Sequence, residues 1–177
     1  FLLATIPAHA QVASLGKGWM LGPIGSITSA PGEVISGRNS IKGSSDGSTG
    51  SQVRIAIQTD PGFIPFAPNQ SYTFTFKYRI VASSSSATFE YTFASSAGIG
   101  SARDFGPGGP IFGAAGSSGT VTNTLTLHNW PDYVVYFSIG GAGTLVIDDI
   151  RITNANGQLV AAENAEGPTI VPGPLNL

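Results

Sequence analysis

The strongest constraint on this chain is a strict alternation of apolar and polar side chains in several segments. In "SYTFTFKYRIVA", residues 71–82, Tyr, Phe and Ile fill the even positions up to 80, and Thr, Lys and Arg fill the odd positions from 73 to 79. Successive side chains of a strand point to opposite faces, so this pattern predicts a strand with one buried face and one polar face. The same pattern recurs in "ATFEYTFAS" (87–95) and "GTVTNTLTLHN" (119–129), whereas helical periodicity is almost absent.

Less regular apolar segments predict further strands. They are "SQVRIAIQ" (51–58), "YVVYFSI" (133–139) and "TLVIDDIRIT" (144–153), with short edge pieces near Ile24–Ile27, Val34–Ile35 and Leu159–Ala161. Residues 98–119, which contain "GPGGPIFGAAGSSG", lack any period and predict one long loop. Many short strands separated by Gly, Pro, Ser and Asn turns favour an all-β fold, an antiparallel β-sandwich of the jelly-roll type.

Composition excludes several classes of protein. The 177 residues suit one domain, and charged residues make up only 10% of them. Eight basic and ten acidic residues give a net charge of −2 without a basic cluster, which argues against a nucleic-acid partner. The absence of cysteine excludes disulfides and thiolate chemistry.

The first residues, "FLLATIPAHAQ", are apolar through Ile6 and place Ala8-His9-Ala10 before Gln11. An apolar run followed by a small-x-small pattern is typical of the end of a secretory signal peptide. An ordinary apolar N-terminal strand is the alternative interpretation of the same residues. We therefore expect a signal-peptide remnant at 1–10, an exported domain at 11–162 and a Pro-rich linker or tail at 163–177. No later segment reaches the ~20 apolar residues of a membrane span.

Catalytic patterns are weak. His128 is the one histidine outside the first ten residues, and neither metal-ligand spacings nor a phosphate loop is present. Asp148 and Asp149 are adjacent in a strand, so their side chains should point to opposite faces and cannot converge as a glycosidase pair. Calcium, which accepts one carboxylate with backbone carbonyls, remains a candidate at this doublet.

A β-bulge is predicted next to the doublet, because two apolar sets in the segment are out of phase. Leu145 and Ile147 form one set, whereas Val146, Ile150 and Ile152 form the other.

Four pieces in order carry a family resemblance: "GKGW" (16–19), "ISGRNSIKG" (35–43), "YTFTFKYRI" (72–80) and "GTLVIDDIRIT" (143–153). Together they resemble the galactose-binding-like jelly rolls of bacterial non-catalytic carbohydrate-binding modules. In that family a Gly-x-x-Ser segment precedes the long strands, here 37–40, and an apolar-Asp-Asp-apolar signature lies in the last strand, here 147–150. The family's usual opening, Asn-x-x-Phe-Glu, which helps to hold a structural calcium, has no counterpart here.

The resemblance implies an exported module, secreted or at the cell surface, that binds a polysaccharide or other glycan and accompanies a polysaccharide-active enzyme. Sugar rings stack on aromatic side chains, and their hydroxyls bond to polar ones, which together give a set of expected ligand-binding residues. That set is Trp130, Asn129, Asp132, Tyr136, Arg38, Arg79 and Glu90, with Asp148 and Asp149 as expected calcium ligands. Trp130 could equally pack the end of a hairpin, whereas Trp19, beside Met20 and Leu21, is expected in the core.

A structural role is the alternative. Low charge, abundant Thr and Gly, and an apolar N-terminal segment would suit a cell-surface or fibre subunit that self-assembles by lending a strand to its neighbour's sheet edge. Residues 1–10 distinguish the two hypotheses, because only strand donation requires that they be retained and packed into another copy. An independent enzyme is the least favoured reading, because acid/base partners are missing.

Overall fold

The computed structural model describes residues 15–48, 54–95 and 105–167, and every regular element in these parts is a β-strand. The strands are β1 (Trp19–Leu21), β2 (Gly25–Thr28), β3 (Ser40–Asp46), β4 (Arg54–Thr59), β5 (Ser71–Ser83), β6 (Thr88–Ser95), β7 (Phe105–Pro110), β8 (Ser118–Thr126), β9 (Tyr133–Gly140), β10 (Ala142–Asn154) and β11 (Leu159–Glu163).

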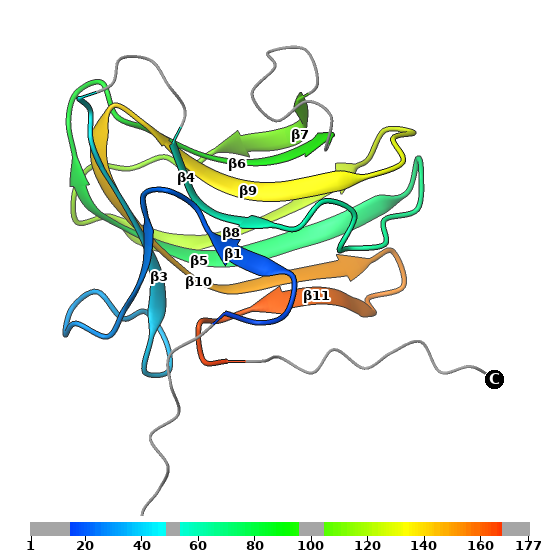
Figure 1. The fold of residues 1–177 in the computed structure, drawn as a ribbon, viewed down its shortest axis with the longest axis horizontal. Coiled ribbons are helices and arrows are strands. Elements are labelled where there is room, and N and C mark those ends of the chain that lie inside the picture. Colours follow the sequence, from blue (N-terminus) through cyan, green and yellow to red (C-terminus); the bar gives the residue numbers. More distant parts are fainter. Residues whose placement is uncertain (1–14, 49–53, 96–104, 168–177) are drawn as a thin grey trace, which may run out of the picture.

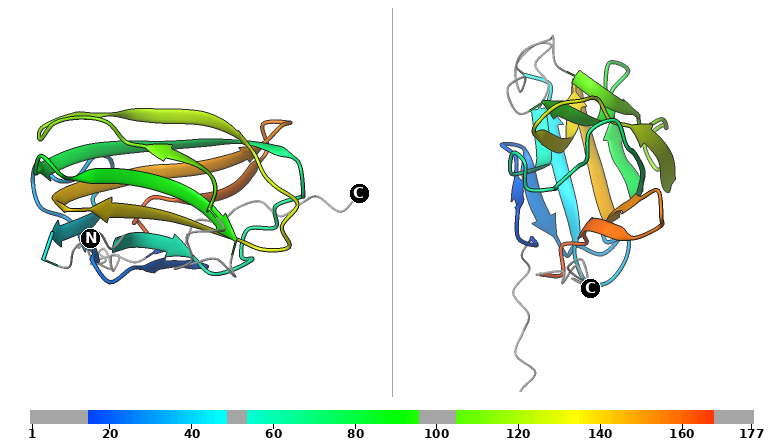
Figure 2. Two further views of the ribbon diagram at one scale, coloured as in Figure 1. Left: turned by 90° about the horizontal axis from the view of Figure 1, so that it is seen from above. Right: turned by 90° about the vertical axis from the view of Figure 1, so that its right-hand side faces the viewer.

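The strands form two antiparallel sheets that face each other (Figure 1, Figure 2). The five-stranded sheet has the order β1-β4-β9-β6-β7. The six-stranded sheet has the order β2-β3-β10-β5-β8, and β11 pairs with β10 as well. This confirms the predicted antiparallel β-sandwich.

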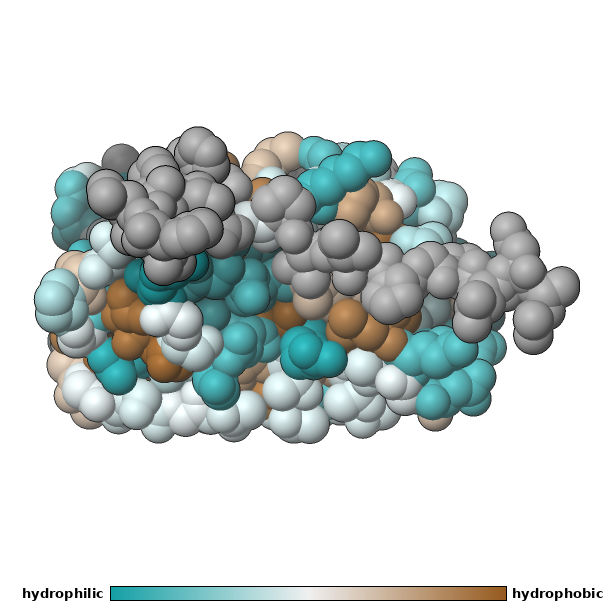
Figure 3. Space-filling model, turned by 90° about the horizontal axis from the view of Figure 1, so that it is seen from below, coloured by the Kyte–Doolittle hydropathy of each residue, from teal (hydrophilic) through white to brown (hydrophobic). Residues whose placement is uncertain are grey.

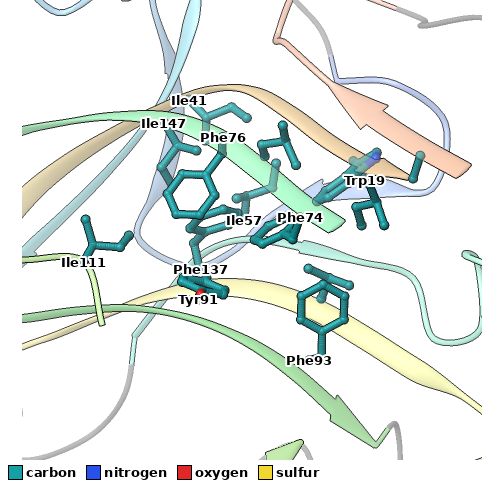
Figure 4. Close-up of a cluster of buried hydrophobic side chains, with 14 of the residues drawn as sticks. Trp19, Ile41, Ile57, Phe74, Phe76, Tyr91, Phe93, Ile111, Phe137 and Ile147 are labelled. Carbon is teal, nitrogen blue, oxygen red and sulfur yellow. The ribbon is translucent and has the colours of Figure 1, made fainter. Parts of the chain in front are cut away.

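Aromatic and branched side chains from both sheets fill the space between them (Figure 4). The ring centroids of Phe76 on β5 and Phe137 on β9 lie 4.8 Å apart, and those of Phe74 and Tyr91 lie 5.2 Å apart. These residues occupy the apolar positions of the alternating segments, as predicted, and Trp19 joins them in the core. Truncating a buried Phe of this kind typically costs about 3–5 kcal/mol.

The predicted strands at 71–82, 87–95, 119–129, 133–139 and 144–153 are confirmed as β5, β6, β8, β9 and β10. The described part of 51–58 is β4, and two of the three edge pieces are β2 and β11. The prediction at Val34–Ile35 is wrong: these residues lie in an irregular connection before β3. The short β1 and the Gly- and Ser-rich β3 were not predicted, because neither shows a clear apolar alternation.

Strand β7 corrects the prediction of an uninterrupted loop over 98–119. Its sequence "FGPGGP" contains no alternating apolar residues, yet it pairs with β6 through Glu90↔Pro110, Tyr91↔Gly109 and Thr92↔Gly108. A Cβ on Gly108 would lie 2.4 Å from the Tyr91 carbonyl oxygen. Glycine therefore permits a close approach of two strands that periodicity does not signal.

The C-terminal part of the described chain is tied to the sandwich beyond the expected domain end at 162. Glu163 is the last residue of β11, and its carboxylate accepts hydrogen bonds from the Gly16 and Ala165 amides, each at 2.6 Å. The Glu166 carboxylate accepts hydrogen bonds from the Arg38 and Asn39 amides. Residues 1–10, the expected signal-peptide remnant, lie outside the described residues.

The surface seen in Figure 3 is mainly hydrophilic, and apolar side chains reach it in separate places. Nowhere in the described ranges does the chain form a helix that is long and apolar enough to cross a membrane.

Candidate functional site

A row of residues crosses the outer face of the five-stranded sheet, the face turned away from the core. Val135 and Phe137 on β9 are core residues, so Tyr136 between them must point outward. Residues directly opposite each other in antiparallel strands share a face. The register therefore places one residue of each of the five strands in a line: Met20, Gln58, Tyr136, Thr92 and Gly108. Gly108 has no side chain, so it leaves a gap at the end of this row.

A second row runs beside the first on the same face. It consists of Ile55, Ser138, Glu90 and Pro110, which oppose one another on β4, β9, β6 and β7. Ile55 belongs to a small apolar cluster that also contains Ala94, Val134 and Tyr136. The outer face is thus a mixed surface, apolar near β4 and richer in hydroxyl and carboxyl groups near β6.

A cavity of about 350 Å³ opens where β7 borders this face. Its lining residues are Glu90, Tyr91, Thr92, Gly106, Gly108, Gly109, Pro110 and Tyr136. The hollow exists because β7 contributes glycines where other strands present side chains. A Cβ on Gly106 would meet the Phe93 carbonyl oxygen at 2.3 Å and Trp130 Cζ3 at 2.9 Å, so Gly106, like Gly108, is sterically required.

The cavity combines one carboxylate with two hydroxyls. The Tyr136 side chain is 4% exposed, and this burial is the main reason that the pKa of its hydroxyl is raised. A hydrogen bond with Thr92 opposes the shift, and the nearby negative charge of Glu90 adds to it. Tyr136 is therefore a neutral phenol at physiological pH, and exposed Glu90 is a hydrogen-bond acceptor for groups entering the cavity.

Gln58, next to Tyr136 in the row, has an unused acceptor. Its Nε2 lies 3.2 Å from the Met20 sulfur, but its Oε1 is buried without a hydrogen-bond partner among the described residues. Leaving a buried polar atom unsatisfied costs about 1–3 kcal/mol, and such atoms are uncommon in native proteins.

The structure brings together two of the seven expected ligand-binding residues, Glu90 and Tyr136, as lining residues of the cavity. The sequence interpretation missed Thr92, although it alternates in phase with Glu90 and could have been found on that basis. The sequence did not indicate that Gln58 and the glycines of β7 lie near Tyr136, because their position depends on pairing between distant segments.

Three other expected residues lie in the β8–β9 connection. Trp130 is half-buried, and its ring lies 5.0 Å from that of His128 and 5.2 Å from that of Tyr133. Asn129 and Asp132 are exposed beside it. These contacts correspond to the packing alternative for Trp130.

The two expected arginines lie on other surfaces. Arg79 is on the outer face of the six-stranded sheet, and its guanidinium donates a hydrogen bond to the Gly32 carbonyl. Arg38 is exposed in the connection that precedes β3. Neither is a lining residue of the cavity.

The Asp148–Asp149 doublet sits at a β-bulge, as predicted. The β10–β5 register shifts between Asp148 and Arg151, and Asp149 has a φ of 48°. The bulge resolves the two apolar sets, because Leu145 and Ile147 before it and Ile150 and Ile152 after it all enter the core.

Asp148 is fully buried and anchors the connection before β3. Its Oδ2 accepts hydrogen bonds from the Ser40 hydroxyl at 2.6 Å and the Ser36 amide at 3.0 Å, and its Oδ1 accepts one from the Asp149 amide at 2.7 Å. Burial raises the pKa of this carboxyl, whereas these donors lower it.

Asp149 makes a different set of contacts. Its carboxylate forms an ion pair with Lys77 at 2.7 Å and accepts a hydrogen bond from the Ser36 hydroxyl at 2.9 Å. These partners hold its pKa below the usual range against the opposing effect of burial.

The donor set around the doublet does not fit a calcium ion. Calcium needs six to eight oxygen ligands, whereas Asp148 and Asp149 are surrounded by N–H, O–H and ammonium donors. No group of three or more His, Asp or Glu side chains suited to a metal occurs in residues 15–48, 54–95 and 105–167.

No protein-family model and no curated protein matches the chain, but solved structures do. It is similar to the C-terminal family 22 carbohydrate-binding module of Clostridium thermocellum Xyn10B, with a TM-score of 0.59 and 16% identity over 80% of this chain and 87% of that one. The CBM22-1 xylan-binding domain of Paenibacillus barcinonensis Xyn10C has a TM-score of 0.53 and 13% identity, covering 82% of this chain and 87% of that one.

A third structure contains the N-terminal CBM22-1 and GH10 modules of C. thermocellum Xyn10B in complex with xylohexaose. It matches with a TM-score of 0.56 and 13% identity over 86% of this chain and 29% of that one. Identities this low establish the fold alone. The chain has the jelly-roll fold found in these carbohydrate-binding modules.

Proposed function

We propose that this chain is a non-catalytic module that binds a neutral polysaccharide on the outer face of its five-stranded sheet. The observation that carries the proposal is the cavity in which Glu90, Thr92 and Tyr136 converge beside the glycine-rich strand β7. The similar solved structures add support, because they are carbohydrate-binding modules and one of them is a xylan-binding domain.

The chemistry of the cavity suits sugar hydroxyls. A sugar hydroxyl both donates and accepts hydrogen bonds, so it can donate to Glu90 and exchange bonds with Thr92 and Tyr136. A carboxylate in the cavity repels other carboxylates at short range. The expected ligand is therefore a neutral chain rather than a polyuronate.

Binding without catalysis follows from the same residues. Glycoside hydrolysis normally needs two carboxyl groups that flank the scissile bond. Among the described residues that line the cavity, Glu90 alone carries a carboxyl group. The proposal is thus a binding module, exported and joined to a polysaccharide-active enzyme, as CBM22-1 is to GH10 in the Xyn10B structure.

Affinity gel electrophoresis tests the proposal with soluble xylan, mixed-linkage β-glucan, galactan and mannan, and with polygalacturonate as the acidic comparison. We expect retardation by at least one neutral polysaccharide and none by polygalacturonate. Thr92→Val and Tyr136→Phe, which each remove one hydroxyl, should weaken the retardation. Thr124→Val on the outer face of the six-stranded sheet is the matched control. Retardation by none of the four, or retardation that both cavity variants retain in full, would contradict the proposal.

Strand donation between copies remains the alternative. It depends on residues 1–10, which lie outside the described residues. Sedimentation velocity of the chain with and without these ten residues tests it: concentration-dependent polymers that vanish with the deletion would favour a fibre or surface subunit.

A further inference from the structure

Phe112 is the second residue after the end of β7, and most of its phenyl ring is exposed. Its side chain is 79% exposed, whereas the other large exposed apolar residues among the described ones, Met20, Leu21, Phe63 and Val81, are 37–39% exposed. A phenyl ring held in water forgoes the favourable free energy of burial. Nothing in the fold itself explains this exposure.

Strand geometry places Phe112 at the rim of the cavity. Ile111 is a core residue, and its amide donates a hydrogen bond to the Phe89 carbonyl at 2.7 Å, so pairing with β6 continues past the end of β7. Side chains alternate along a strand, so Pro110 and Phe112 both lie on the outer face. Pro110 lines the cavity, and two residues of a strand span about 6.6 Å. The phenyl ring is therefore one strand step beyond the cavity wall.

The backbone around Phe112 is held in place. Its carbonyl accepts a hydrogen bond from the Tyr78 hydroxyl at 3.2 Å. The end of the connection is bonded to β5 in both directions, from the Ile80 amide to the Ser117 carbonyl at 2.8 Å and from the Gly116 amide to the Ile80 carbonyl at 2.7 Å. Phe112 is thus presented from a fixed position, which lowers the entropy cost of a contact with a ligand.

The cavity itself offers no accessible aromatic face. Tyr136 lines the cavity but is 4% exposed, and Tyr91, whose ring packs in the core, is 2% exposed, so neither provides a surface on which a sugar ring can lie. Stacking of a sugar's C–H face requires an open ring. Trp130 also lies beside the cavity, because a Cβ on the lining residue Gly106 would be 2.9 Å from its Cζ3, but its ring is half-buried and packs against His128 and Tyr133. Phe112, at 79% exposed, has the more open ring.

We propose that Phe112 is a sugar-stacking platform at the rim of the cavity and that it makes the site long enough for an oligosaccharide chain. The proposal rests on the proposed polysaccharide binding and assigns different contacts to the two parts of the site. The cavity provides hydrogen bonds to one part of the chain, and Phe112 provides apolar contact to a sugar unit further along. Long and short oligosaccharides must then depend differently on Phe112.

Isothermal titration calorimetry with xylohexaose and xylobiose tests this dependence on Phe112. If β-glucan is the polysaccharide that retards the protein, cellohexaose and cellobiose replace them. We expect Phe112→Ala to lower the affinity for the hexasaccharide about tenfold and to change the affinity for the disaccharide less than about twofold. Phe112→Leu, which keeps an apolar group but not a flat ring, should resemble Phe112→Ala. Phe112→Trp should retain the affinity of the wild type.

Phe112→Trp also provides a direct readout, because its added fluorescence should change on titration with the hexasaccharide. Val81→Ala, an exposed apolar truncation on β5, is the matched control and should bind as the wild type does. Unchanged hexasaccharide affinity in Phe112→Ala overturns the platform while leaving polysaccharide binding intact. If the wild type binds none of the neutral polysaccharides, both proposals fail.

Discussion

The outer faces of the two sheets are built from similar residues but differ in how their polar groups are used. On the six-stranded sheet, hydroxyls pair with each other across β5 and β8: Ser71 with Thr126 at 2.9 Å, Thr73 with Thr124 at 3.3 Å and Thr75 with Thr122 at 3.3 Å. Its charges also pair, Lys77 with Asp149 and Lys42 with Glu33.

On the five-stranded sheet, fewer of the polar groups have hydrogen-bond partners within the protein. Gln58 Oε1 has no partner among the described residues, and Glu90 projects from β6 beside a cavity. A face that satisfies its own hydrogen bonds gains little from a ligand, whereas a face with an exposed acceptor such as Glu90 beside a cavity can gain more. We therefore expect substitutions on the six-stranded sheet to change stability and those on the five-stranded sheet to change binding.

The largest expected effect is on the six-stranded sheet, at Asp148. Asp148→Ala removes the acceptor of three hydrogen bonds and leaves their donors buried, so the free energy of unfolding should fall by about 3 kcal/mol. Urea unfolding measures the loss. Glycan affinity, measured where the variant is still folded, should match the wild type. A variant of normal stability that no longer binds glycan would contradict the assignment of stability to the six-stranded sheet and of binding to the five-stranded sheet.

Glu90→Ala tests the five-stranded sheet. Because Glu90 is exposed, the free energy of unfolding should change by no more than about 0.5 kcal/mol. A lost charge-assisted hydrogen bond is worth about 1.5–3 kcal/mol, so affinity for the neutral polysaccharide should fall at least about tenfold. Glu90→Gln, which lacks the negative charge, should bind polyuronates more strongly than the wild type does. Affinity gel electrophoresis with polygalacturonate can detect this difference. A loss of stability with unchanged affinity would assign Glu90 a structural role instead.

A smaller effect is expected from the Lys77–Asp149 pair, and it depends on pH. The pKa of Asp149 is lowered in the folded protein from an ordinary value of 3.8, so the stability it contributes is present above that value and is lost as the pH falls through its folded pKa. Lys77→Met removes the partner that lowers this pKa. Thermal melts between pH 2 and 6 should then show a weaker acid-side rise in melting temperature. An identical profile in both proteins would show that the pair contributes nothing.

The smallest expected effect is that of a chelator. Since backbone N–H groups, serine hydroxyls and the Lys77 ammonium already bind the carboxylate oxygens of Asp148 and Asp149, excess EDTA should leave the melting temperature unchanged, and added Ca²⁺ should not raise it. A structural calcium at the doublet, the candidate that the chemistry of the two carboxylates left open, predicts the opposite outcome. A drop in melting temperature with EDTA, reversed by Ca²⁺, would place a cation in the protein.

The alternating segments were enough to predict β5, β6 and β8, and the less regular apolar segment at 144–153 predicted β10; together these strands supply most of the core. Alternation also led to Tyr136, because an aromatic residue out of phase with its core neighbours must face outward. The bulge at Asp149 was predictable for a related reason: two apolar sets out of phase can enter one core only if an extra residue lies between them.

The cavity was not predictable in this way. Glu90 and Tyr136 were both expected to bind a ligand, but so were Arg38 and Arg79, which lie on other surfaces, and Trp130, which packs against His128 and Tyr133. A single sequence shows which side chains suit sugar binding, not which of them become neighbours.

By itself, the sequence determined that this chain forms strands, which side chains of the alternating strands are buried and where one strand must bulge. Those properties are local, because side-chain direction repeats every two residues along a strand. Only the tertiary structure decided that Gln58, Tyr136 and Thr92 share a row and that glycine-rich β7 closes beside β6 to leave a hollow. Those properties depend on the register between segments far apart in the chain and on the close approach of backbones, and neither leaves a period in the sequence.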